Sequence, residues 1–340
     1  MQNDCHAGGI EERQMIDSND EVSSALSALK PVVALETTIF SNLGLPSPAN
    51  EQALNRCMSA IRALGAVPAL TAVIDGRIWA GVPTELHQRV LSCGVKIAER
   101  DLSVATAQEL AEGVTTVSAS LAIAERAGIK TFATGGIGGV HRSSAETGDI
   151  SADLNAIARR NVLVVSAGAK AFLDLPRTLE YLETQSVPVV GWQTNHFPAF
   201  YTRDSGLPVP HRVEDAESAA QIHLARRELG QGGTLLVAPI PAADELDPTE
   251  INRVIEESLN DLRDRKISGP QVTPHVLSGL EKATAGESVS ANLSLRPLPA
   301  LKGVPPLGLT IGTFSSSAAC PPRWSHPCQG PCLTFLQRRL

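Results

Sequence analysis

The sequence predicts an α/β fold in one domain, an α/β/α layered sheet that is largely parallel and has helices on both faces. Short apolar segments alternate with amphipathic segments from Pro31 onward, as strands joined by helices do. Residues 162–165 form an apolar, β-branched run with the length of a buried strand. Two of the intervening segments also carry the end residues of helices, which strengthens the alternating assignment.

Six short, mostly apolar segments are expected to be the strands of this sheet. They are residues 32–37, 67–74, 130–134, 161–167, 187–193 and 234–240. In open parallel sheets, functional groups gather beyond the carboxyl ends of the strands. The residues that follow these segments are therefore the first candidates for a functional site.

Two helices are expected from the residues at their ends. Residues 47–48, Ser-Pro, begin the first with proline at its first position, and Gly65 closes it. Residues 247–248, Asp-Pro, begin the second, and Glu250 completes a start that resembles a capping box. The second helix has one apolar face, made of Ile251, Val254, Ile255, Leu259 and Leu262.

The composition is that of an ordinary globular protein, with 340 residues, a net charge of −7 and 43% hydrophobic residues. Lysine and arginine are scattered, so no nucleic-acid surface is expected, although a local pocket for one phosphate is compatible with this pattern. No apolar run approaches the roughly 18 residues of a membrane helix, so no membrane partner is expected. The polar N-terminus lacks a signal-peptide core, and a cytoplasmic location is expected.

The chain is expected to consist of one folded domain between two tails. Residues 1–29 have no sustained apolar period and are expected to be disordered. Residues 30–294 are expected to form the catalytic domain. Residues 295–340 are rich in proline, glycine, serine and cysteine, and this Pro/Cys-rich tail is expected to be disordered.

Two strand ends carry single ionisable residues that suggest catalysis. Glu36 closes the strand at 32–37, where partial desolvation raises the pKa of a carboxyl and suits it to acid–base work. Lys170 follows the strand at 161–167, and a desolvated amine is a usable nucleophile towards a carbonyl carbon. The small residues at 167–169 are expected to leave room for a substrate beside Lys170. The alternatives are a solvated glutamate and a lysine that extends into solvent.

A glycine-rich segment, residues 134–142, follows the strand at 130–134 and ends in His141 and Arg142. Glycines let the backbone approach a ligand and turn N–H groups towards an anion, but this segment is neither a P-loop nor a dinucleotide motif. Asp149 and the nearby Asp153 supply carboxylate oxygens of the kind that suits Mg²⁺ or Mn²⁺. The structural alternative is a tight turn followed by a helix that begins at residue 151.

Several stretches, in order from about Pro31 to Asn292, resemble the pseudouridine-5'-phosphate glycosidases, also called the indigoidine synthase A-like family. The stretches are ALETTI, TGGIGGVHR, DISADL, SAGAK, LDL followed by TLEYLET, VPVVGWQT and FPAFYTRDSG. The resemblance implies reversible cleavage of the C–C glycosidic bond of pseudouridine 5'-phosphate to uracil and ribose 5-phosphate. It also implies a divalent metal, usually Mn²⁺, and a homotrimer of α/β/α subunits.

The resemblance also implies roles for individual residues. It places the nucleophile on Lys170, the proton-donating glutamate on Glu36, a second substrate-binding lysine on Lys96 and the metal-binding aspartate on Asp149. The remaining substrate contacts are expected at Val117, Ser151, Ala152, Asp153, His141, Arg142 and Asn292. Lys96, Arg142 and the glycine turns are expected to hold the phosphate.

Some residues depart from the family pattern. The segment SNLGLP after Glu36 lacks the usual histidine, Ala238 replaces an asparagine, and a Pro/Cys-rich tail follows Asn292 in place of a helix. Two alternatives therefore remain beside the glycosidase. One is an aldolase that forms a lysine imine with a sugar phosphate, and the other is an inactive isoform with an altered C-terminus.

Overall fold

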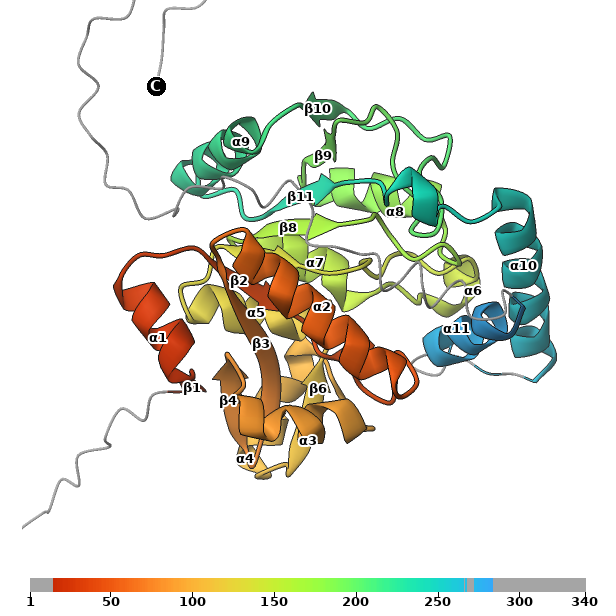
Figure 1. Ribbon diagram of the computed structural model, residues 1–340. Helices are drawn as coiled ribbons and strands as arrows, with labels where there is room; N and C mark the ends of the chain where they lie inside the picture. Colours follow the sequence, from red (N-terminus) through yellow and green to blue (C-terminus); the bar gives the residue numbers. More distant parts are fainter. Residues whose placement is uncertain (1–14, 266, 268–271, 284–340) are drawn as a thin grey trace, which may run out of the picture. The chain divides into compact units, whose positions relative to one another are not determined.

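The central feature of the structure is a mixed sheet. The computed structural model describes residues 15–265, 267 and 272–283 (Figure 1). These residues form an 11-stranded sheet whose main path runs β1-β4-β3-β2-β7-β8-β11-β9-β10, while β6 pairs with β3 and β5. The strands are β1 (Ile16–Asp17), β2 (Val32–Leu35), β3 (Val67–Ile74), β4 (Arg77–Ala80), β5 (Lys96–Ile97), β6 (Glu112–Thr115), β7 (Thr131–Ala133), β8 (Leu163–Ser166), β9 (Val189–Trp192), β10 (His211–Val213) and β11 (Thr234–Val237).

All six segments expected to be strands lie in the parallel part of this sheet. The pairs from β3 through β2, β7, β8, β11 and β9 to β10 are all parallel. The carboxyl ends of these strands therefore meet at one edge of the sheet, which is the arrangement on which the prediction of the site residues was based. The antiparallel pairs are those that β3 makes with β4 and β6.

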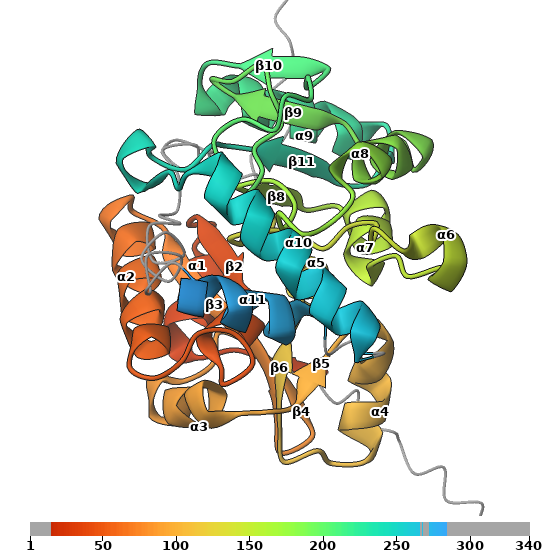
Figure 2. The same ribbon diagram turned by 90° about the vertical axis from the view of Figure 1, so that its right-hand side faces the viewer.

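Helices cover both faces of the sheet, which confirms the α/β/α prediction (Figures 1 and 2). Along β2, Val32 and Ala34 join the core that contains α5 and α7, whereas Val33 and Leu35 join the core that contains α2 and α9. The helices are α1 (Asp20–Ser27), α2 (Ala49–Ala63), α3 (His87–Ser92), α4 (Leu102–Ala107), α5 (Val117–Arg126), α6 (Ser144–Thr147), α7 (Ala152–Arg159), α8 (Leu175–Thr184), α9 (Ala216–Glu228), α10 (Pro248–Asp264) and α11 (Val272–Ala283). Short 3₁₀ turns are η1 (Thr38–Phe40), η2 (Thr84–Leu86), η3 (Glu99–Asp101) and η4 (Ala242–Asp244).

The two helices expected from their end residues are present. Helix α2 begins one residue after Pro48, which is its cap, and Gly65 just beyond its end has a φ of +79°. Helix α10 begins at Pro248, and the Asp247 carboxylate accepts from the amides of residues 249 and 250. The apolar face of α10 is buried except at Leu259, which is partly buried.

Strand β4 was not expected, although the sequence contains its strongest indicator. The two residues between β3 and β4 are Asp75 and Gly76, with φ values of +51° and +69°. An Asp-Gly pair with positive φ at both positions is the preferred two-residue link of an antiparallel hairpin. The hairpin turns the chain back before β4 and produces one of the two antiparallel pairs that make the sheet mixed.

The N-terminal prediction is wrong from residue 15 onward. Residues 1–29 were expected to be disordered, but β1 pairs with β4 and α1 packs into the core through Val22 and Ala25. The Asn19 side chain caps α1 by accepting from the Val22 amide at 2.9 Å. Val22 and Ala25 are the two buried residues of this helix, and two positions are too few to reveal a helical repeat of apolar residues in the sequence.

The described residues all belong to one compact unit, which supports a single folded domain. None of the described helices combines the length and apolar content needed to cross a membrane. The tail predicted at residues 295–340 lies outside the described residues, as do residues 1–14.

Candidate active site

A cavity of about 590 Å³ lies beyond the carboxyl ends of β2, β7 and β8, where the segments around β5 and after β6 also converge. This is the sheet edge at which functional groups were expected. The predicted residues that line it are Glu36, Lys96, Val117, His141, Asp149, Ser151, Ala152, Asp153 and Lys170. Asn292 lies outside the described residues. Residues far apart in the sequence, predicted from strand ends and from the family resemblance, therefore line one cavity.

Glu36 lies in a buried position at the carboxyl end of β2 and is only 7% exposed. Its Oε1 accepts a hydrogen bond from Thr134, which directly follows β7. Burial raises the pKa of Glu36, and the charges of Lys170 and Lys96 and the Thr134 hydroxyl only partly oppose this rise. A carboxyl with a raised pKa keeps its proton to higher pH and can donate it.

Lys170 reaches the cavity from the segment that follows β8. Its amide donates to the carbonyl of Ile137 at 3.1 Å, which fixes this segment against the glycine-rich loop. Gly168 has a φ of +88°, and a Cβ there would lie 2.0 Å from the carbonyl oxygen of Pro198. The small residues at 167–169 are buried and do not line the cavity, so they serve backbone packing and not the substrate space that was expected.

The glycine-rich loop also has a different role from the expected one. The Gly138 amide donates at 2.8 Å to Asp153 Oδ2, and the Ser118 amide donates at 3.0 Å to Asp153 Oδ1. A Cβ on Gly138 would lie 2.2 Å from Ser151 Oγ. Gly138 therefore lets the loop pack against the start of α7, and its N–H points to a carboxylate of the protein. Asp153, which is 6% exposed, joins the loop to the start of α5.

Lys96 lies on β5 and faces the same cavity. Burial lowers the pKa of Lys96, the positive charge of Lys170 lowers it further, and Asp153 and Glu36 oppose the change. The cavity thus holds two lysines and two buried carboxyls within range of one another's charge. Such a site can bind an anion and also supply a nucleophile and an acid.

His141 and Asp149 lie together on another wall of the cavity. His141 Nδ1 is 3.7 Å from Asp149 Oδ2, and the His141 amide donates to the Asp149 carbonyl at 3.1 Å. The two strands of this loop are joined by a bridge between Val140 and Ile150. Burial lowers the pKa of His141 despite the opposing charge of Asp149, so the neutral imidazole is favoured.

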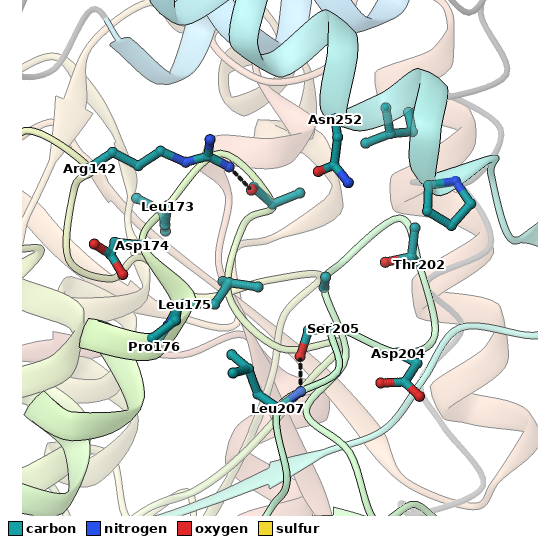
Figure 3. Close-up of a pocket in the computed structure, with 14 residues that line it drawn as sticks. Arg142, Leu173, Asp174, Leu175, Pro176, Thr202, Asp204, Ser205, Leu207 and Asn252 are labelled. Carbon is teal, nitrogen blue, oxygen red and sulfur yellow. Dashed lines mark hydrogen bonds between the residues drawn. The ribbon is translucent and has the colours of Figure 1, made fainter.

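Arg142 does not line this cavity, and its expected role in phosphate binding is not supported. It lines a separate cavity of about 490 Å³, where its Nη2 lies 3.4 Å from the Ala171 carbonyl oxygen (Figure 3). Its Nη1 pairs with Glu256 of α10. Arg142 therefore joins the segment after Lys170 to helix α10. Arg142 stands in a turn that the Ser144 amide closes by donating to the His141 carbonyl at 2.9 Å, so the chain changes direction between the His141 and Arg142 side chains.

Several residues of the site were not predicted. Thr116 and Ser118 line the cavity at the start of α5, and their hydroxyl oxygens lie 3.0 Å apart. The threonine before the apolar run of α5 is a typical helix start, so the sequence could have indicated these residues. Thr134, which donates to Glu36, is the last residue of the strand predicted at 130–134, so its position at a strand end could also have indicated it. The remaining additions to the lining are Thr38, Leu43, Gly94, Ala98, Arg100, Gly138, Ile150, Phe172 and Leu173.

The comparisons with known proteins agree with this geometry. A family described as indigoidine synthase A like protein matches residues 21–298. The chain is 49% identical over 284 residues to a pseudouridine-5'-phosphate glycosidase of Methylobacterium nodulans, which covers 83% of this chain and 84% of the relative. It is 48% identical to a protein of the same name from Caldanaerobacter subterraneus, with 83% of this chain and 92% of the relative covered.

Two solved structures share the fold. One is the prealnumycin C-glycosynthase AlnA in complex with ribulose 5-phosphate, with a TM-score of 0.78, 37% identity, and coverage of 86% of this chain and 96% of that chain. The other is an indigoidine synthase A-like protein of Thermotoga maritima, with a TM-score of 0.75, 34% identity, and coverage of 86% of this chain and 95% of that chain. Sequence, fold and the position of the cavity lead to one conclusion: this chain belongs to the indigoidine synthase A-like family.

Proposed function

We propose that the protein cleaves the C–C glycosidic bond of pseudouridine 5'-phosphate reversibly, giving uracil and ribose 5-phosphate. The observation that carries the proposal is the convergence of Lys170, Glu36 and Lys96 on one cavity. The names of the relatives support the substrate, and the ribulose 5-phosphate bound to a structural neighbour supports a sugar phosphate. The resemblance to the family also supports a homotrimer in the cytoplasm, and both belong to the proposal.

The bond to be broken explains why a lysine is needed. A C–C glycosidic bond has no leaving oxygen to protonate, so the two-carboxylate mechanism of ordinary glycosidases is poorly suited to it. A lysine imine makes C1′ an electron sink and offers another route. In the proposed route, Glu36 donates a proton to the ring oxygen as the C1′–O4′ bond breaks and the Lys170 amine forms a bond to C1′. The Glu36 carboxylate then takes the proton that the Lys170 nitrogen releases, which restores both the nitrogen lone pair and the acid.

The second half of the route releases the base. The nitrogen lone pair of Lys170 forms the C=N bond as the C1′–C5 bond breaks, and C5 of uracil takes up a proton. Glu36 lines the same cavity as Lys170 and is proposed as the acid in this step as well. Water then hydrolyses the imine, which returns the free lysine and ribose 5-phosphate.

The phosphate is expected to lie near Lys96 and the start of α5. The N-terminus of a helix favours an anion, and Thr116, Val117 and Ser118 of this start line the cavity. The lysine adds a compact positive charge on the adjoining wall. This assignment replaces the expected phosphate site at Arg142 and the glycine turns.

The residues around Asp149 fit a divalent metal. Its carboxylate is 34% exposed and lines the cavity, beside the imidazole of His141. In the part of the chain that the structure describes, no group of three or more His, Cys, Asp or Glu side chains could hold a metal. Mn²⁺ and Mg²⁺ can instead be held by one carboxylate with waters and substrate oxygens. When bound at Asp149, such a metal supplies positive charge beside those oxygens.

Changing Asp149 to alanine should remove the response of activity to the metal. The variant loses the one carboxylate proposed as a ligand, while Glu36 and Lys170 remain in place. Uracil release is measured at increasing Mn²⁺ for the parent and the variant, and only the parent should respond. Glu146→Ala, on the exposed turn beside this loop, is the matched control and should titrate like the parent. An unchanged Mn²⁺ titration in the Asp149 variant would remove this residue from the metal site.

One assay separates the proposed function from its alternatives. Pseudouridine 5'-phosphate is incubated with the full chain, with and without Mn²⁺, and uracil and ribose 5-phosphate are measured together. Equal amounts of both products are expected. An aldolase would cleave a bond within the sugar and release no uracil. An inactive isoform would leave the substrate intact under both conditions.

A further inference from the structure

A cluster of buried hydroxyls lies beside the backbone segments that carry Glu36 and the start of α5. Thr37, Thr71, Thr115 and Ser120 are all 0% exposed, and they come from the end of β2, from β3, from the end of β6 and from α5. We call these four residues the hydroxyl network. None of the four lines the cavity, and neither the fold prediction nor the proposed reaction uses them.

The members of the network bond to one another and to the backbone. Thr71 Oγ1 lies 2.7 Å from Thr115 Oγ1 and 2.8 Å from Ser120 Oγ, and Thr37 Oγ1 lies 3.1 Å from Thr115 Oγ1. The Thr37 hydroxyl donates to the Thr71 carbonyl at 2.7 Å. The Thr115 amide donates to Thr37 Oγ1 at 2.9 Å, and the Ser120 hydroxyl donates to the carbonyl of Thr116 at 2.8 Å.

The network joins two neighbouring backbone segments that both contribute residues to the lining of the cavity. Glu36 and Thr38 flank Thr37, whereas Thr116 and Val117 follow Thr115. The Thr38 hydroxyl adds a direct bond to the Thr115 carbonyl at 2.7 Å. The position of residues 36–38 relative to the start of α5 is therefore set by hydrogen bonds, some directly to Thr115 and others through Thr71, and not only by core packing.

Core packing alone does not explain this network, because apolar side chains could fill the same space and would bury no polar groups that need hydrogen-bond partners. A buried hydroxyl without a partner is unfavourable, so the four hydroxyls depend on one another. In return, hydrogen bonds fix direction and distance, which apolar packing does not do. From this geometry we infer that the hydroxyl network positions Glu36 and the start of α5 for the proposed reaction, on which the inference rests.

The test compares two buried threonines on strands of the same sheet. Thr71→Val removes the central hydroxyl and keeps the shape. Thr131→Val is the matched control, because Thr131 is buried at the first residue of β7, at the opposite edge of the sheet from the cavity. We expect kcat for uracil release to fall by about ten- to a hundredfold in Thr71→Val, since small misplacements of reacting groups have effects of this size. KM should change by less, and Thr131→Val should stay within about twofold of the parent.

Thr71→Ser supplies the rescue, because it restores the hydroxyl and removes only a methyl group. Its kcat should return close to that of the parent. If Thr71→Val unfolds more readily yet keeps the parent's kcat below its melting transition, the network is only structural and the inference is wrong. If Thr71→Val does not fold, Ser120→Ala is measured instead. The same loss of kcat is expected, and an unchanged kcat would again show that the inference is wrong.

A second measurement separates this inference from the proposed function. If the parent releases no uracil, the proposed function fails. Crystal structures of Thr71→Val and Thr131→Val then test whether the hydroxyl network sets the position of the Glu36–Thr38 segment. A displacement of the Glu36–Thr38 segment relative to Thr115–Val117 in the first variant, and not in the second, is expected. Unchanged positions in both variants would overturn the inference.

Discussion

Lys170→Ala is expected to lower the rate of uracil release by about a hundredfold or more, because no other amine is proposed to form the bond to C1′. The residue lines the same cavity as Glu36, and its backbone is fixed by the bond to Ile137. Substrate binding should weaken much less than turnover, since Lys96 and the start of α5 remain. Steady-state kinetics of the parent and the variant measure both quantities.

Chemical trapping tests the same residue without relying on turnover. Borohydride added with ribose 5-phosphate reduces an imine to a stable amine, and mass spectrometry of the digested protein locates the sugar. The adduct is expected on Lys170 in the parent and should be absent from Lys170→Ala. Lys30→Ala removes an exposed lysine far from the cavity and serves as the control. An adduct on another lysine, or full activity in Lys170→Ala, would show that the nucleophile is assigned to the wrong residue.

Glu36→Gln is expected to reduce turnover by about 10²- to 10⁴-fold, the usual range for removing a general acid–base group. Glutamine keeps the shape and can still accept the bond from Thr134, but it cannot donate and recover a proton. Burial raises the pKa of Glu36, so the protonated form persists to higher pH than in an exposed glutamate. In the parent, kcat should therefore fall as the pH rises through this raised pKa, and the variant should lack that decline.

Stability provides the control for Glu36→Gln. The folded protein binds the Glu36 proton more tightly than the unfolded chain does, because the folded pKa is the higher of the two. This contribution to the free energy of unfolding is complete below the unfolded pKa of about 4.3 and is lost as the pH rises through the folded pKa. Relative to the parent, the glutamine variant should therefore gain stability over that range. A variant that is unstable as well as inactive would indicate a structural role for Glu36.

The sequence was sufficient to predict the strands that are buried on both faces. Strand β3 matches its predicted bounds, and β8 and β11 lie within theirs, because continuous apolar runs mark such strands. Strands β5 and β10 are short and include charged residues, so their pairing depends on neighbours distant in the sequence. Helix α1 depends on a contact between Val22 and Gly81 that no local pattern contains.

The residues of the candidate site that could be predicted from the sequence pattern are those that lie at the ends of predicted strands. Glu36 and Lys170 were found because each follows a recognisable strand. The roles of Asp153, Gly138 and Arg142 were not predictable in this way, because they depend on partners on other elements. Glycines occur where the backbone must approach a ligand and also where two backbone segments pack closely, and both cases give the same sequence pattern. Only the structure distinguishes these two roles.

The order of three strands has a consequence for the size of the substrate. Strand β7 lies between β2 and β8, so the strand that positions Glu36 and the strand that leads to Lys170 are two strand spacings apart. Two spacings amount to about 10 Å, a length set by the hydrogen bonds of the sheet and not by any side chain. The sheet thus fixes the separation of the two strand ends from which the Glu36 and Lys170 side chains reach the same cavity. Because both groups act at C1′ and O4′, a longer or shorter sugar would have to be accommodated elsewhere in the cavity, at the segments 94–100 and 141–153 that also line it.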